Sequence, residues 1–133
     1  MVSRLRKVLF LLMLVISPVA AAKDDPDLEM TTTDGYRLHV HSQMQPMGIN
    51  QIHSWRLEIS NTAGLVSGAN ISVEGGMPEH NHGLPTQPQV TEEIEPGVYL
   101  IEGIRFHMPG SWQMRFVIQF EGADTEAVLD FQL

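Results

Sequence analysis

The chain has 133 residues, no cysteine and a formal net charge of −8. This length has room for one domain with its own hydrophobic core, and the acidic balance argues against nucleic acid as a partner, because phosphate neutralisation requires a basic surface. The lack of cysteine excludes disulfides and removes thiolate from the possible metal ligands and nucleophiles.

The first 22 residues have the three-part layout of a secretory signal peptide. A basic start (Arg4, Arg6 and Lys7) precedes an apolar run, Val8–Ile16, and small residues follow at Ala20–Ala22. The apolar run is well short of the ~20 residues that a spanning helix needs. We therefore predict that the segment is cleaved; a retained membrane anchor is the alternative.

Cleavage would leave residues 23–27 as a flexible lead-in and residues 28–133 as the folded domain. It would remove three basic residues and no acidic one, which gives a formal net charge of −11. We expect a periplasmic or secreted protein with no membrane span after cleavage.

Apolar residues alternate with polar ones between turn signals along the rest of the chain, a pattern that predicts half-buried β-strands. Asp34-Gly35 predicts the first hairpin, between strands at Leu28–Thr32 and Tyr36–Val40. The next strand is Trp55–Ile59, and a short strand at Ile71–Val73 is expected to end at Gly75-Gly76.

A loop rich in Pro, Gly and His follows from Met77 to Pro88. Strands are then predicted at Val90–Ile94, Val98–Phe106, Trp112–Phe120 and Ala127–Phe131, with Val98 and Leu100 on one face of the second. About seven short strands without a helical period predict an all-β fold, an immunoglobulin-like antiparallel β-sandwich; a small β-barrel is the alternative.

Two segments combine His and Met beside Pro or Gly turns: Met77–Gly83 and Phe106–Trp112. His80 and His82 are two residues apart, so in an extended segment both imidazoles point to the same side and can chelate one ion. Met77 can add its thioether from the start of the loop. Because neighbours on a regular strand point to opposite faces, one of His107 and Met108 is expected to join them.

Imidazole and thioether donors without thiolate favour copper, whereas calcium and magnesium want an oxygen-rich cage. The predicted metal ligands are Met77, His80, His82, His107 and Met108. A purely structural use of the same residues is the alternative, with the His hydrogen-bonded and Met108 filling the end of the sandwich.

The three remaining histidines give weaker indications of a metal site. His39 and His41 alternate with Leu38 and Val40, so we expect them to face solvent, with a second metal site involving Met44 or Met47 as the alternative. His53 precedes Trp55 at a strand start and is expected to be structural.

The pattern Met77-Pro78-x-His80-x-His82-Gly83, followed by Gly97-Val98-Tyr99 and by Phe106-x-Met108-Pro109-Gly110-x-Trp112, resembles the YtkA-like domain family, which is related to FixH. The resemblance covers roughly residues 57–133. It implies an immunoglobulin-like sandwich of the cell envelope. Because several relatives are associated with copper handling or with assembly of respiratory oxidases, it also implies a metal ion and an envelope or oxidase-assembly protein as partners.

No nucleophile elbow, phosphate loop or catalytic triad stands out, so we expect that the protein is not an enzyme. The sequence favours a periplasmic metal-binding protein, a copper carrier or chaperone with a His/Met site. The alternative is a metal-independent interaction module that presents the loop at 77–88 to a cell-envelope protein.

Overall fold

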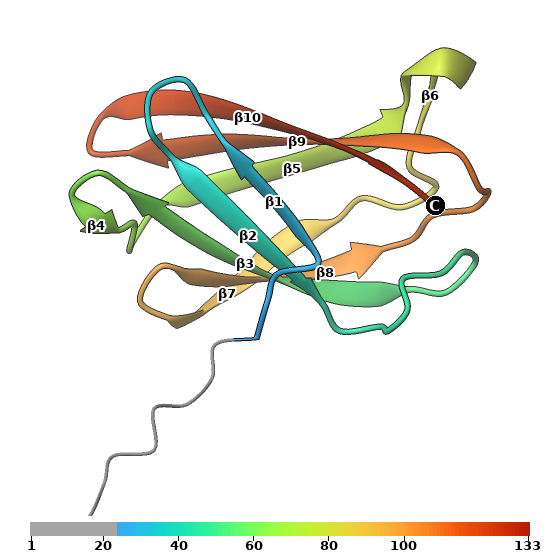
Figure 1. Ribbon diagram of the computed structural model, residues 1–133, viewed down its shortest axis with the longest axis horizontal. Helices are drawn as coiled ribbons and strands as arrows, with labels where there is room; N and C mark the ends of the chain where they lie inside the picture. Colours follow the sequence, from blue (N-terminus) through green and yellow to red (C-terminus); the bar gives the residue numbers. More distant parts are fainter. Residues whose placement is uncertain (1–23) are drawn as a thin grey trace, which may run out of the picture.

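The computed structural model describes residues 24–133, and the signal peptide predicted over residues 1–22 lies outside this part of the chain. The described residues form two antiparallel sheets that pack face to face as an immunoglobulin-like β-sandwich (Figure 1). No helix within residues 24–133 has the length and apolar character needed to cross a membrane.

Six strands make the first sheet and four make the second. In the first sheet the order is β1 (Leu28–Thr31), β2 (Arg37–Ser42), β3 (His53–Asn61), β8 (Val98–Ile104) and β7 (Gln89–Glu95), with β4 (Gly64–Leu65) paired to β3. In the second sheet the order is β10 (Ala123–Gln132), β9 (Ser111–Phe120), β5 (Asn70–Met77) and β6 (His82–Gly83). A single 3₁₀ turn, η1 (Pro78–His80), joins β5 to β6.

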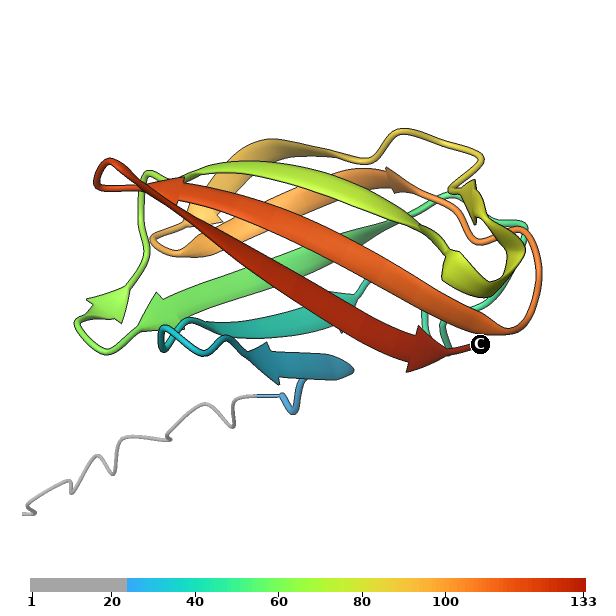
Figure 2. The same cartoon turned by 90° about the horizontal axis from the view of Figure 1, so that it is seen from above.

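The core lies between the two sheets, whose strands cross one another in the view of Figure 2. It is made by the inward residues of alternating strands, as the period-2 pattern predicts. In β3 these residues are Trp55, Leu57 and Ile59, and in β9 they are Trp112, Met114, Phe116 and Ile118, all at most 1% exposed. Full burial of each such side chain contributes about 1.5–3 kcal/mol, which explains how the domain can fold without disulfides.

The predicted end of the strand at Gly75-Gly76 is wrong, because β5 continues to Met77. Gly75 and Gly76 pair with Met114 and Gln113 of β9. A Cβ on Gly75 would collide with Met114 Sδ, and one on Gly76 would lie 2.6 Å from the carbonyl oxygen of His82. These glycines therefore mark a close approach inside the sheet rather than a turn.

The predicted face of β8 is right for Val98, which is buried (8% exposed), and wrong for the residues that follow. Tyr99 and Ile101 are fully buried, while Leu100 is only half-buried. Trp55 of β3 pairs with Ile101, whereas His53, two residues earlier in β3, pairs with Ile104, three residues later in β8. Gly103, within the longer stretch, has φ +83°. The extra residue is a β-bulge, which resets the alternation, so that Ile104 and Phe106 face the core as expected.

The end of the sandwich that carries β4 is fixed by side chains that cap backbone groups. The buried hydroxyl of Tyr99 donates to the Val66 carbonyl oxygen (2.6 Å) and accepts from the Ala69 N–H (3.1 Å). The Glu93 carboxylate accepts from the N–H groups of Gly97 (2.9 Å) and Gly68 (3.0 Å). The candidate site lies at the other end, beside β6 (Figure 1).

Candidate metal-binding site

The segment that holds His80 and His82 is a tight turn and not the extended strand that the spacing alone would suggest. Met77 pairs with His82 across β5 and β6, while Asn81 between the histidines adopts a left-handed conformation (φ 51°) and donates its N–H to the Pro78 carbonyl (3.2 Å). Both histidines are solvent-exposed. Their rings stack with centroids 5.8 Å apart and an interplanar angle of 18°.

His107 joins them from the loop that follows β8. Its ring centroid lies 5.0 Å from that of His82, and ring contacts in this region connect His80 to His82 and His82 to His107. The three side chains form a row at one end of the molecule, which we call the imidazole row, with His82 in the middle. Residues 25 positions apart in the sequence thus become neighbours.

The inner end of the imidazole row rests on the core. The His107 ring meets the Trp112 ring edge to face, with centroids 5.4 Å apart and planes at 79°. Its Nδ1 atom is buried and has no hydrogen-bond partner within residues 24–133. An unpaired buried nitrogen of this kind costs stability.

The two predicted thioether ligands have different surroundings. Met77 is 1% exposed and belongs to the hydrophobic core, where a Cβ placed on Gly110 would come within 2.7 Å of its Cε. Met108 is half-buried and packs against the core, and its carbonyl oxygen accepts from Trp112 Nε1 (3.0 Å). The fold therefore brings the predicted imidazoles together and leaves these two methionines in apolar packing.

Ring spacing can be compared with the demands of a shared ion. A metal–nitrogen bond of about 2.0 Å places an ion about 3.2 Å from an imidazole centre, so two rings on one ion have centres about 4.5–6.4 Å apart. Both neighbouring pairs in the imidazole row fall within this range. The spacing of each pair is therefore compatible with two adjacent imidazoles on one ion.

A site with three donors already in place is not present in the described part of the chain. Within the part of the chain that the structure describes, no group of three or more His, Asp or Glu side chains is arranged to hold one ion. Within residues 24–133, His82 has a ring contact with each of the other two histidines, whereas no ring contact joins His80 to His107. Three imidazoles on one ion would require the exposed His80 to turn about its side-chain torsions.

Open space adjoins His82 on the outer face of the second sheet. A shallow depression of about 500 Å³ there is lined by His82, Gly76, Glu74, Gln113 and Arg115 among others. Arg115 Nε lies 3.7 Å from Glu126 Oε1. Water or a small polar ligand therefore has room beside the middle of the imidazole row.

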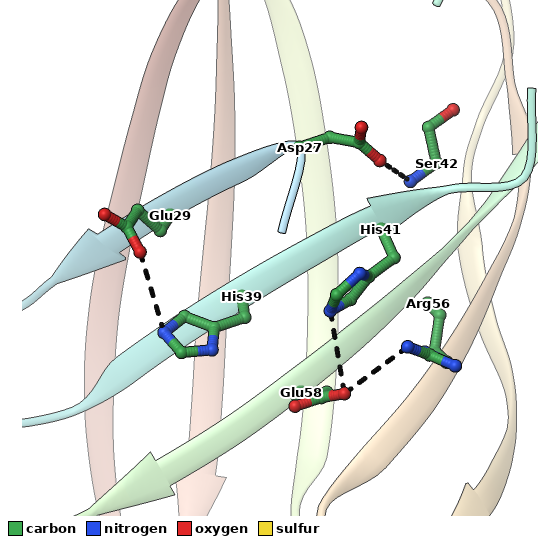
Figure 3. Close-up of polar contacts among 7 residues, drawn as sticks. All are labelled: Asp27, Glu29, His39, His41, Ser42, Arg56 and Glu58. Carbon is green, nitrogen blue, oxygen red and sulfur yellow. Dashed lines mark hydrogen bonds and ion pairs between the residues drawn. The ribbon is translucent and has the colours of Figure 1, made fainter. Parts of the chain in front are cut away.

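The outer face of β1, β2 and β3 holds the second pair of alternating histidines (Figure 3). His41 Nε2 lies 3.6 Å from Glu58 Oε1, and Arg56 Nη2 lies 3.5 Å from the same oxygen. His39 Nε2 lies 3.9 Å from Glu29 Oε2. Leu38 and Val40 are buried on the other face, so the predicted outward orientation of both histidines is confirmed.

Methionines do not accompany this second pair as the alternative site would need. Met47 packs against the core, and the Met44 N–H is held by the Ser42 hydroxyl (3.2 Å) at the end of β2. The two histidines instead interact with carboxylates that neighbour them across the strands (Figure 3).

His53 is buried at the start of β3, where its Nδ1 lies 3.1 Å from the Gln51 carbonyl oxygen and its ring contacts Phe106. The contact of His107 with Trp112 was not predicted from the sequence, which placed Trp112 at the start of the strand Trp112–Phe120. Its position five residues after His107, across the Pro109-Gly110 turn, was the available signal. The buried ring supports the site from inside.

The fold and this end of the molecule define an immunoglobulin-like sandwich domain with a row of imidazoles beside its last sheet edge. A family model for YtkA-like proteins matches residues 30–117, and the chain belongs to the YtkA-like family. A search of curated proteins gave no match.

Among solved structures, the chain is similar to a DUF4426 family protein from Pseudomonas aeruginosa PAO1. The TM-score is 0.55 at 6% sequence identity, and the match covers 79% of this chain and 94% of that chain. At this identity the likeness supports the fold alone.

Proposed function

We propose that this protein is an exported copper-binding protein that carries copper in the periplasm, with the imidazole row as its binding site. The observation that carries the proposal is that His82 contacts both His80, from the same turn, and His107, from the loop after β8, with two of the three histidines exposed. Imidazole is a good ligand for late first-row metals, and copper(II) binds such sites most strongly among the divalent ions of that row.

The charge of the protein supports a cationic cargo. The chain carries 16 acidic and 8 basic residues, so its field attracts metal ions towards the surface. Glu79 is the one carboxylate within residues 77–83 and 106–112, so the site itself offers nitrogen rather than an oxygen cage. The predicted signal peptide supports a periplasmic place of action, and we propose binding and transfer rather than catalysis.

Copper titration tests this function directly. The purified protein is titrated with copper in each oxidation state and compared with a His80→Ala/His82→Ala double variant and with His39→Ala as a matched control. We expect wild type and His39→Ala to bind one equivalent at micromolar concentration, and the double variant to lose it. A wild-type protein that binds copper in neither state would refute the proposal.

A second candidate function is a metal-independent interaction module, and one observation favours it. Ile52 and Ile49 are exposed (69% and 38%) in a loop, residues 43–52, that has no charged residue. The Asn50 N–H donates to the Phe106 carbonyl oxygen (2.7 Å), so this loop lies next to the residue that precedes His107. An envelope protein, such as the oxidase-assembly partners that the family resemblance implies, could dock on this apolar end.

Capture experiments separate the two functions. The protein is used as bait in three forms, all in the presence of a metal chelator: unchanged, with its 77–88 loop replaced by Gly and Ser, and with Ile49→Ser/Ile52→Ser. Retention of a partner by the unchanged form and its loss in either altered form, with no copper bound in the titration, would support the interaction module. Equal capture by all three forms would remove it.

A further inference from the structure

We infer that the ion held by the imidazole row is copper in the cupric state, bound by imidazole nitrogen with His82 as the shared ligand, and that Met77 and Met108 serve packing. This inference rests on the proposed copper-binding function. It narrows the His/Met site predicted from the sequence to a site of nitrogen donors, and it names the oxidation state.

The Met77 thioether is out of reach for an ion that arrives from solvent. Met77 is 1% exposed, and its terminal methyl packs so tightly on the turn at Gly110 that a single added Cβ would touch it. Withdrawing the side chain to face solvent would open a cavity in the core and undo that packing. Met108 is half-buried and packs against the core, while the neighbouring His107 contacts His82.

The imidazoles are the accessible donors. His80 and His82 are exposed, and the two ring separations of 5.8 and 5.0 Å both suit a shared ion. His82 takes part in both pairs, so it is the one residue that every two-imidazole arrangement needs.

Oxidation state follows from donor type. Copper(I) is a soft ion and prefers thiolate and thioether sulfur, whereas copper(II) prefers imidazole nitrogen and oxygen in a tetragonal arrangement. The depression of about 500 Å³ beside His82 leaves room for water to complete such an arrangement. Cysteine is absent from the chain, so no thiolate can shift the balance towards copper(I).

The test measures each oxidation state on the purified protein with single variants. Copper(II) chloride is titrated while Trp fluorescence and electron paramagnetic resonance are recorded, and copper(I) is offered anaerobically against a chromogenic copper(I) chelator. His82→Ala, His80→Ala and His107→Ala test the ligands, and Met77→Leu and Met108→Leu test the thioethers. Circular dichroism confirms that each variant is folded.

We expect copper(II) to quench Trp112, whose ring lies 5.4 Å from His107, and to show nitrogen hyperfine structure. His82→Ala should weaken copper(II) binding roughly 100-fold or more, because it breaks both pairs. His80→Ala and His107→Ala each leave one pair intact, so each should weaken binding only about twofold if the two pairs bind equally well. The two Leu variants should bind copper(II) as wild type does. Copper(I) held more tightly than copper(II), and lost in a Leu variant, would overturn the inference and leave the proposed function standing. Binding of neither state would refute both.

Discussion

The hydroxyl of Tyr99 is a single atom on which the β4 end of the sandwich depends. Tyr99 is 2% exposed, and its hydroxyl links two backbone groups of the segment between β4 and β5, Val66 and Ala69. Burial raises the pKa of Tyr99, so the phenol stays protonated and can donate. The change Tyr99→Phe removes this atom and leaves the ring.

The cost can be worked out from the two partners. Val66 is fully buried, so its carbonyl oxygen loses a partner that water cannot replace, whereas Ala69 is half-buried and its N–H can reach solvent. A buried polar group left unpaired costs about 1–3 kcal/mol, and we expect a total loss of about 2 kcal/mol in the free energy of unfolding. In a domain of this size, that corresponds to a fall in Tm of about 8–12 °C.

Denaturant and thermal unfolding, followed by circular dichroism, measure this loss. Tyr36→Phe is the matched control, because the described part of the chain shows no hydrogen bond from the Tyr36 side chain, which packs half-buried against the core. We expect the control to stay within about 0.5 kcal/mol of wild type. If Tyr99→Phe unfolded at the same denaturant concentration as Tyr36→Phe, the capping role given to this hydroxyl would be wrong.

Two further changes test the fold that supports the site. Gly110→Ala should lower the free energy of unfolding by about 2–4 kcal/mol, because φ is +138° and the new Cβ would meet Met77 Cε. Gly64→Ala is the control, since its φ of +127° brings the same backbone strain while its Cβ would meet open space. Equal losses of Tm in the two variants would refute the clash with Met77. Glu93→Gln should matter at neutral pH and not in acid. The Gly97 N–H, above all, holds the pKa of Glu93 below its usual 4.5, so its contribution is present above that pH and is lost as pH falls through the lowered value. The gap in Tm between wild type and Glu93→Gln should therefore shrink below about pH 4, and a constant gap from pH 3 to pH 7 would contradict the capping.

Strands with a clean alternation were predictable from sequence. Trp112, Met114 and Phe116 stand on one face of β9, as the pattern indicates, since each strand residue points opposite to its neighbour. β5 and β8 were not fully predictable. The pair Gly75-Gly76 looks like a turn but lies inside a strand, and the bulge at Gly103 shifts the buried face of β8 to Tyr99 and Ile101.

The candidate site, too, was predictable only in part from the sequence. His80 and His82 could be paired from their spacing, although a turn rather than a strand brings them together. The contact of His107 with His82 was only a hypothesis, because it depends on where β8 ends relative to β6. The sequence also left open whether the Met77 side chain faces an ion or the core, since a residue at the end of a strand can do either.

The sequence by itself determined the period of the strands, the absence of thiolate and disulfide chemistry, and the two segments in which His and Met stand beside turns. Local rules suffice for these because alternation, composition and turn residues are properties of short stretches. Only the tertiary structure decided that His107 from a separate loop joins His80 and His82 in one row while Met77 fills the core. That outcome depends on how two sheets pack against each other, and the packing of a side chain is settled by neighbours far away in the sequence.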